Sequence, residues 1–412
     1  MKENGGIFSQ NNRRNEAIVR VMKVRFFILT ICMSVLLLSS ALSYEISILI
    51  YFTVFFSIFP IILFIYNRSA NIRRMYVSDL FFYLFIICGL ISALANSDME
   101  SLMNIVCMLT MYIGLSIIYN SFQTATLHVL AISICLSHLI ILLLSFFMNR
   151  VVFNAFAGIY SNPNMMGLAM TLLAVVLLGG TIQYFQGVTK KVPVVVLVSL
   201  FIFVFYIILL TQSRTAAITV ITAVIMSMVL LAIQNASSIR KVGALVTVLF
   251  VLSMAFIFSL SKIPLLNEAV QKIVGKFQRK SADLSDGRMA IWQNIIKDST
   301  LFGHGENYHV GQLDAHNTFI ALLAEYGWLA VTFFLLFVAA LVWNAFSFAK
   351  KQVKYTNMLQ LLPFLILITY ILLSMTEIII YTTPIMIVLF VLSGNSFTHH
   401  KLSLNSSNMN KT

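Results

Sequence analysis

Several short polar sequences border the apolar segments of this chain, and they contain the residue types that acid–base chemistry needs. In "DAHN", His316 and Asn317 come directly before an apolar run that contains Glu325. An unperturbed imidazole is mostly neutral near pH 7 and can accept a proton from a hydroxyl group. We interpret His316 as a candidate general base and Asn317 as a candidate substrate ligand. The alternative for His316 is an ordinary interfacial or helix-capping histidine.

Two arginines are candidates for binding phosphate. Arg214 lies in "TQSRTA", residues 211–216, a turn so short that its residues must lie at the ends of the flanking apolar segments. Arg288 follows the helix-start sequence "DG", so its charge would add to the positive end of the helix dipole and favour an anion. A guanidinium is permanently charged and binds phosphate in a bidentate fork. The alternatives are snorkelling of Arg214 towards lipid phosphates and a solvated surface charge at Arg288.

Two further polar sequences supply candidate substrate ligands. "GIYSNPNMMG", residues 158–167, places Asn162 and Asn164 ahead of another apolar segment. Asn-Pro favours a turn and asparagine side chains bond local backbone, so the segment is either a helix cap or the wall of a polar cavity. "GHG" places His304 in a tight turn, a weak motif when taken alone.

The sequence offers no familiar motif for metal binding or for a serine nucleophile. His304, His309 and His316 do not have the spacing of known zinc sites. The four cysteines lie inside apolar segments without a C-x-x-C pair and are interpreted as small buried hydrophobes. The sequence has neither G-x-S-x-G nor D-x-D. We therefore expect chemistry that uses no metal and no cofactor and is built from Arg and His side chains.

The composition indicates a membrane protein that crosses the bilayer many times. Of its 412 residues 60% are hydrophobic and 10% charged, whereas soluble domains have about 45–50% and 25%. A segment of about 20 apolar residues can cross the hydrocarbon core. The predicted fold class is all-α and polytopic, with about 12 transmembrane helices and one long extracytoplasmic loop that contains short helices. The spans are expected near 26–43, 46–66, 80–95, 102–120, 126–147, 166–185, 192–211, 215–234, 242–260, 317–343, 358–376 and 378–394.

The basic residues predict the orientation of these spans. If both termini are cytoplasmic, most of the 27 Lys and Arg lie on that side, as the positive-inside rule requires. The short outer loops keep only Arg150 and Arg214. The net charge of +13 is therefore mostly a matter of topology, and binding of nucleic acid is not expected.

The spans divide the chain into five parts. A basic cytoplasmic N-terminus, 1–25, is followed by helices 1–9 within 26–260; the first is interpreted as an uncleaved helix, with a signal peptide as the alternative. The outer loop, 261–316, is expected to hold the catalytic elements, and its residues Met289, Trp292 and Ile296 form one stripe of a helix along the membrane surface. Helices 10–12 occupy 317–394, and the tail 395–412 is polar and cytoplasmic.

Glu325 poses a separate question, because a carboxylate inside an apolar span is costly. It follows His316 by nine residues, which in a regular helix is about 13–14 Å along the axis and roughly half a turn away around it. A catalytic dyad of these two residues within one regular helix is therefore excluded. Glu325 is expected either to pair with another helix or to line a cavity.

Taken in order, these motifs resemble the O-antigen ligase and O-antigen polymerase (Wzy-like) family of polytopic membrane glycosyltransferases. The "SNPN" segment also fits the family, and the resemblance covers roughly 158–343. It rests on Ser213–Arg214 at a span start, Arg288 with Trp292, the turn Gly303–Gly305, His316–Asn317, and Glu325 with Gly327.

The resemblance implies a polysaccharide polymerase that joins undecaprenyl-diphosphate-linked oligosaccharide repeat units into a capsule, exopolysaccharide or O-antigen. The transfer would be metal-independent and take place at the outer face of the bacterial cytoplasmic membrane. Arg214 and Arg288 would bind and stabilise the leaving diphosphate, and His316 would activate the acceptor hydroxyl.

Two alternatives stay open at this point. Within the family, a ligase would pass a finished glycan to lipid A core, a protein or a wall polymer. From another class, a transporter or flippase for the same lipid-linked glycan would need charges distributed through its spans. The expected partners are membrane lipids, a flippase and chain-length regulator proteins.

Overall fold

The computed structural model describes residues 23–24, 26–66, 75–122, 125–185, 194–234, 271, 275, 287–305, 308, 315–350 and 360–393. The predicted span 242–260, most of the outer loop 261–316, His309, the basic N-terminus and the tail 395–412 lie outside the described residues.

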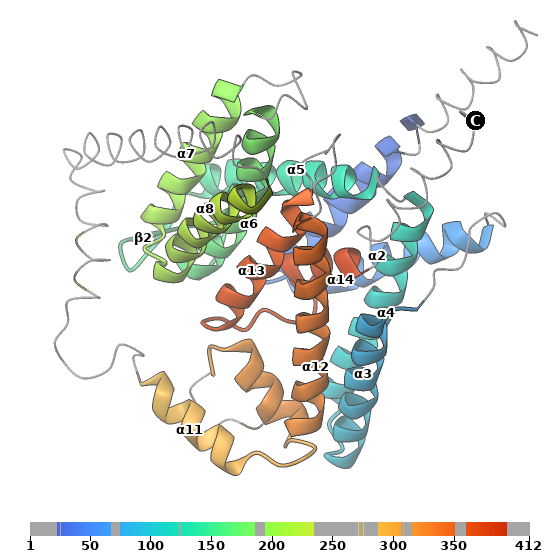
Figure 1. Cartoon of the computed structure of the whole chain (residues 1–412). Helices are drawn as coiled ribbons and strands as arrows, with labels where there is room; N and C mark the ends of the chain where they lie inside the picture. The colour runs from blue at the N-terminus through green and yellow to red at the C-terminus, as the bar shows by residue number, and fades with distance from the viewer. Residues whose placement is uncertain are drawn as a thin grey trace, which may run out of the picture.

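The described part of the chain is mostly helical, as expected for a polytopic membrane protein (Figure 1). Six of its helices are long and apolar enough to cross a membrane, and five shorter apolar helices, including Phe26–Leu42, accompany them. The total of twelve spans stays a prediction. The labelled helices that follow the predicted spans are α2 (Leu49–Tyr66), α3 (Val77–Ala95), α4 (Met99–Phe122), α5 (Ala125–Met148), α6 (Pro163–Phe185), α7 (Val194–Leu210), α8 (Arg214–Gln234), α12 (Thr318–Lys350), α13 (Leu362–Ser374) and α14 (Pro384–Ser393).

A β-hairpin corrects the all-α prediction. Strands β1 (Arg150–Val152) and β2 (Ala155–Gly158) pair antiparallel between α5 and α6. The chain turns at Phe153 and Asn154, which have φ values of 52° and 61°. Asparagine tolerates this left-handed region better than most residues, and β2 is buried along its whole length. The hairpin is short, so the apolar pattern of the neighbouring spans concealed it.

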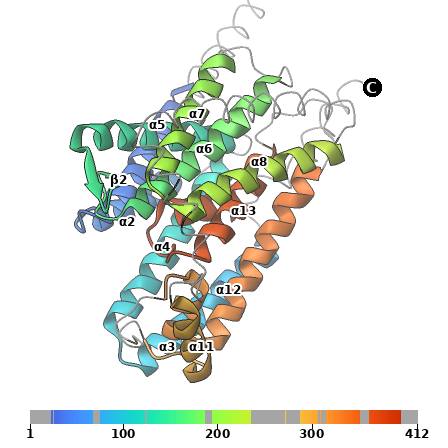
Figure 2. The same cartoon turned by 90° about the vertical axis from the view of Figure 1, so that its left-hand side faces the viewer.

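Aromatic side chains form the centre of the helical bundle. Phe82 of α3 stacks on Tyr112 of α4 with ring centroids 3.9 Å apart. Phe337 of α12 and Phe390 of α14 lie 5.1 Å and 5.4 Å from Phe82 in the same cluster. Offset or edge-on aromatic pairs of this kind add to the stabilisation from buried area. They hold α12 along α3, as both views of the molecule show (Figures 1 and 2).

Helix α12 is not regular, because Gly327 breaks it with φ 82° and ψ −178°. The freed backbone groups pair with the turn that contains His304. The amides of His304 and Gly305 donate to the carbonyl oxygens of Ala324 and Glu325 at 2.9 and 3.0 Å, and Trp328 N donates to Thr300 O at 3.2 Å. The "GHG" turn is therefore a backbone clamp on the break in α12.

Between α13 and α14 the structure differs from the expected span at 378–394. Residues 375–383 are not helical, and α14 begins only at Pro384. Backbone groups of this segment bond to the start of α12 instead of to a helix of their own. Thr318 Oγ1 donates to Glu377 O at 2.9 Å and accepts from Ile379 N at 2.7 Å. The start of α12 thus fixes a polar segment within an apolar part of the sequence.

Candidate functional site

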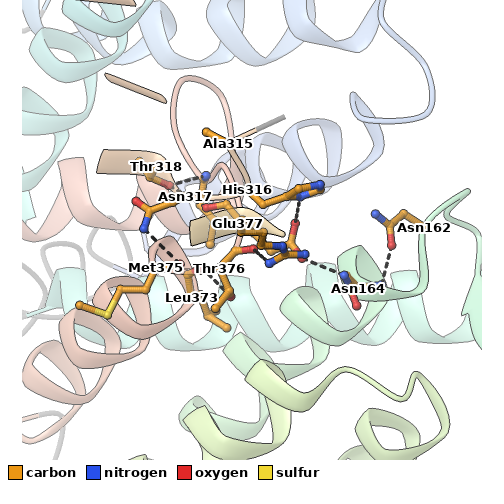
Figure 3. Close-up of polar contacts among 12 residues, drawn as sticks. Asn162, Asn164, Ala315, His316, Asn317, Thr318, Leu373, Met375, Thr376 and Glu377 are labelled. Carbon is orange, nitrogen blue, oxygen red and sulfur yellow. Dashed lines mark hydrogen bonds and ion pairs between the residues drawn. The ribbon is translucent and has the colours of Figure 1, made fainter. Parts of the chain in front are cut away.

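The candidate site lies where the start of α12 meets the segment 375–383. Asn317 caps α12: its Oδ1 accepts from Phe319 N and Ile320 N at 2.9 and 3.2 Å. Its amide nitrogen donates to Met375 O at 3.2 Å. One side chain therefore begins the helix and also joins it to the neighbouring segment, as Figure 3 shows.

His316 faces Glu377 across this junction. Its Nδ1 lies 3.7 Å from Glu377 Oε2, and the imidazole is 40% exposed whereas the carboxylate is 9% exposed. The backbone of His316 has φ 45°, a left-handed conformation that costs a non-glycine residue about 1 kcal/mol or more. Its neighbours Ala315 and Asn317 are both hydrogen-bonded to other elements, and these bonds hold His316 in this conformation. His316 is thus held in place and accessible, while its carboxylate partner is covered.

Three of the candidate residues, Asn164, Arg288 and His316, lie around the buried carboxylate of Glu377. Asn164 Nδ2 donates to its Oε1 at 2.8 Å, and Arg288 is close enough to stabilise its charge. Burial raises the pKa of this carboxyl group, and the charges of His316 and Arg288 offset part of that rise. Sequence reasoning missed Glu377. The signal that was available is a single carboxylate between two apolar segments on the predicted outer side.

Helix α11 (Arg288–Asp298) clamps both sides of the junction. Its first residue donates from a guanidinium nitrogen to Thr376 O at 3.1 Å. One turn later, Trp292 Nε1 donates to Ala315 O at 2.7 Å. The spacing of these two residues puts them on the same face of the helix, and the sequence correctly placed Arg288 at the helix start.

The sequence predicts that Met289, Trp292 and Ile296 form one stripe of α11 along the membrane surface. The structure corrects this prediction at Trp292. Ile291 and Ile295 are the buried residues of this helix, while Met289 and Ile296 are 47% and 45% exposed. Trp292 points towards the protein, because its indole N–H finds an acceptor in Ala315 O.

The two asparagines at the start of α6, Asn162 just before it and Asn164 in its first turn, fit both interpretations offered for them: a helix cap and the wall of a polar cavity. Asn162 Oδ1 accepts from Asn164 N at 2.9 Å, which turns the chain into α6. Asn164 then directs its own side chain to Glu377. Asn162 also lines a cavity of about 500 Å³, together with His316 and Glu377.

Arg214 and His304 lie at two different places in the structure. Arg214 begins α8, and the residue before it lies so close to Gly167 that a Cβ there would be 2.9 Å from Ser213 Cβ. The start of α8 is therefore beside α6, one turn beyond Asn164. His304 lies elsewhere, with Nε2 2.9 Å from Asp298 O and its ring stacked on Tyr308. These contacts belong to the "GHG" turn that holds the break in α12, and they do not involve Glu377.

Glu325 is buried and pairs with other elements. Ser101 of α4 donates to its Oε1 at 3.0 Å, and the hydroxyl of Tyr381 donates to its Oε2. This is the pairing with another helix that the sequence left as one alternative. Through Tyr381, Glu325 also ties the segment that carries Glu377 to α4.

The arrangement defines a class of protein: a helical membrane protein with a cavity lined by a histidine and a buried carboxylate, with an arginine near that carboxylate. No group of three His, Cys, Asp or Glu side chains fit for a metal occurs among the described residues. Residues 199–335 match the family model described as O-antigen ligase. That match spans about a third of the chain and includes Arg214, Arg288 and His316. It confirms the resemblance to O-antigen ligase and polymerase proteins, whereas no curated protein matches the chain.

Proposed function

We propose that this protein is a polysaccharide polymerase that uses an undecaprenyl-diphosphate-linked glycan as its donor. The family match supports a membrane glycosyltransferase-like function in polysaccharide synthesis. The proposal puts the reaction at the outer face of the cytoplasmic membrane, where the positive-inside rule places His316 and Glu377. A flippase and a chain-length regulator are the partners that such a reaction requires.

One observation carries the proposal: an accessible imidazole lies beside a covered carboxylate, and both residues line a cavity. In the transfer step, the acceptor oxygen forms a bond to the anomeric carbon of the donor while the bond from that carbon to the phosphate oxygen breaks. The acceptor proton passes to His316, and the electron pair leaves with the diphosphate. The carboxylate of Glu377 stabilises the imidazolium that forms.

Arginines stabilise the leaving diphosphate in this scheme. Arg288 is held by Thr376 O and lies near the carboxylate of Glu377. Arg214 begins the helix next to α6. Both arginines are the first residue of a helix, and the bond to Thr376 O orients the Arg288 guanidinium before negative charge develops on the phosphate.

Replacing either arginine with alanine is expected to lower transfer by about 100- to 1,000-fold, as the loss of a preorganised cationic donor does. The lysine variants should recover part of the activity, because they keep the charge and lose the bidentate fork. The readout is the length of the surface glycan in the native host, with expression verified. Lys297→Ala is the matched control, since Lys297 is an exposed cation on the same helix as Arg288.

The same experiment separates the polymerase from the ligase. Products of a single repeat unit support the polymerase, whereas long chains left on the lipid carrier indicate the ligase. Long chains of normal length on the cell surface in both alanine variants would remove these arginines from the mechanism.

The acid side of the pH profile tests Glu377. Because burial raises the pKa of its carboxyl group, it should protonate above the ordinary glutamate value of about 4.3. In this scheme activity needs an ionised Glu377, so it should fall more steeply with acidification in the wild type than in Glu377→Gln, which has no carboxyl group to protonate. The measurement is the transfer rate of purified protein against pH. Equal slopes in the two proteins would contradict the role given to Glu377.

A further inference from the structure

The cavity beside His316 contains a buried histidine that the proposed transfer step does not use. His138 of α5 is fully covered, and it lines the cavity. Its Nδ1 lies 3.0 Å from the carbonyl oxygen of Ile134. Nδ1 also lies 2.9 Å from Ser137 Oγ, so in either tautomer it has a partner within α5 and Nε2 is the ring nitrogen left to bond a ligand. That Nε2 has no hydrogen-bond partner among the described residues.

Thr383, a second residue of this cavity, also has an unpaired polar atom. Thr383 Oγ1 is buried without a partner within the part of the chain that the structure describes, and Thr383 also lines the cavity. Leaving a buried donor or acceptor unpaired costs about 1–3 kcal/mol, so native proteins rarely do so. Two such groups at one cavity indicate a ligand that brings hydroxyl groups to them.

The rest of the lining has a mixed character. Ser40, Ser43 and Thr382 contribute polar groups, and three tyrosines, Tyr44, Tyr160 and Tyr381, contribute rings. Asn162, His316 and Glu377 add further polar groups, and most of the other side chains are aliphatic, among them residues of α6 and α14. A pyranose has the matching chemistry, since its C–H face packs on aromatic and aliphatic side chains while its hydroxyls both donate and accept.

We infer that this cavity is the pocket for the acceptor sugar, with His138 Nε2 and Thr383 Oγ1 bonding two of its hydroxyls. The volume of about 500 Å³ falls within the roughly 300–1,000 Å³ of small-molecule sites. His316 lines the same cavity, so a sugar seated there presents a further hydroxyl to the proposed base. An isoprenoid chain is the competing occupant, but hydrocarbon would leave both polar groups unpaired. The inference rests on the proposed function for the role of the sugar.

The test measures binding separately from transfer. The purified full-length protein is titrated with the oligosaccharide repeat unit released from the host's own lipid-linked intermediates, and in parallel with farnesyl phosphate. Thr383→Val keeps the side-chain shape and His138→Phe keeps a planar ring, and each removes the hydrogen-bonding group. Each should weaken binding of the oligosaccharide by about tenfold, as the loss of one buried hydrogen bond predicts, and should leave farnesyl phosphate binding unchanged.

Two controls make the outcome decisive. Thr383→Ser restores a hydroxyl and should recover oligosaccharide binding. Thr369→Val removes a buried hydroxyl from α13 that bonds to Leu365 O outside the cavity, so it should bind the oligosaccharide like the wild type. Unchanged oligosaccharide binding in Thr383→Val and His138→Phe overturns the inference, and weaker farnesyl phosphate binding overturns it in favour of the isoprenoid chain.

Binding by the His316→Ala variant distinguishes failure of this inference from failure of the proposed function. If that variant still binds the oligosaccharide but no longer transfers it, both proposals stand. If it still transfers the glycan while the cavity variants lose binding, the sugar pocket stands and the catalytic assignment fails.

Discussion

Replacing His316 with alanine is expected to lower the rate of glycan transfer by about 100- to 10,000-fold, the usual contribution of a positioned general base. The effect should fall on turnover more than on binding, because the imidazole acts on a proton that moves only in the transition state. The measurement is a transfer assay with purified protein and lipid-linked donor. Lys297→Ala, outside the site, should keep the wild-type rate.

A double variant tests whether His316 and Glu377 act as a unit. Their side chains lie 3.7 Å apart, and groups that serve one step are strongly non-additive. Glu377→Ala alone should lower the rate, but His316→Ala with Glu377→Ala should be about as slow as His316→Ala. If the two losses multiply, the carboxylate serves another purpose than stabilising the imidazolium.

Replacing Gly327 with alanine is expected to lower the free energy of unfolding by more than about 3 kcal/mol. The residue has φ 82° and ψ −178°, a conformation essentially restricted to glycine. A Cβ there would also lie 2.5 Å from Leu301 O and close to Gly303 N. The clamp between the "GHG" turn and α12 would have to open, and Asn317 and His316 at the start of the same helix would lose their anchor.

The stability measurement is the thermal midpoint of the protein in detergent, together with the folded fraction after purification. Gly180→Ala in α6 is the matched control, since the atoms nearest to its added Cβ would be 3.8 Å away and alanine is favoured within a helix. A Gly327→Ala protein as stable as Gly180→Ala would show that the break in α12 can relax without cost.

The helices could be predicted from the sequence because long apolar runs have few other solutions in a membrane. The placement of Arg288 was predictable for a similar reason, since "DG" before a periodic segment is a local signal. The break at Gly327 was not, because the apolar pattern continues on both sides of it and a single glycine is tolerated in many helices. Only the pairing with the distant turn gives that glycine its meaning.

Glu377 shows the same limit at the site. Its partners come from α6, α11 and the start of α12, and no local spacing connects it to them. Glu377 lies between the predicted spans 358–376 and 378–394, where a single carboxylate is interpreted as part of a short loop. Tertiary contacts bring the segment 375–383 into the candidate site, and helix periodicity does not reveal such contacts.

The bond between Asn164 and Glu377 has a consequence for exchanging parts between relatives. Both residues lie outside the segment 199–335 that matches the family model. A chimera that receives 158–167 from another protein while keeping its own 375–383 would join two loops selected for different partners. Because this bond joins the segments 158–167 and 375–383, we expect grafts of substrate preference to succeed only when both are moved together.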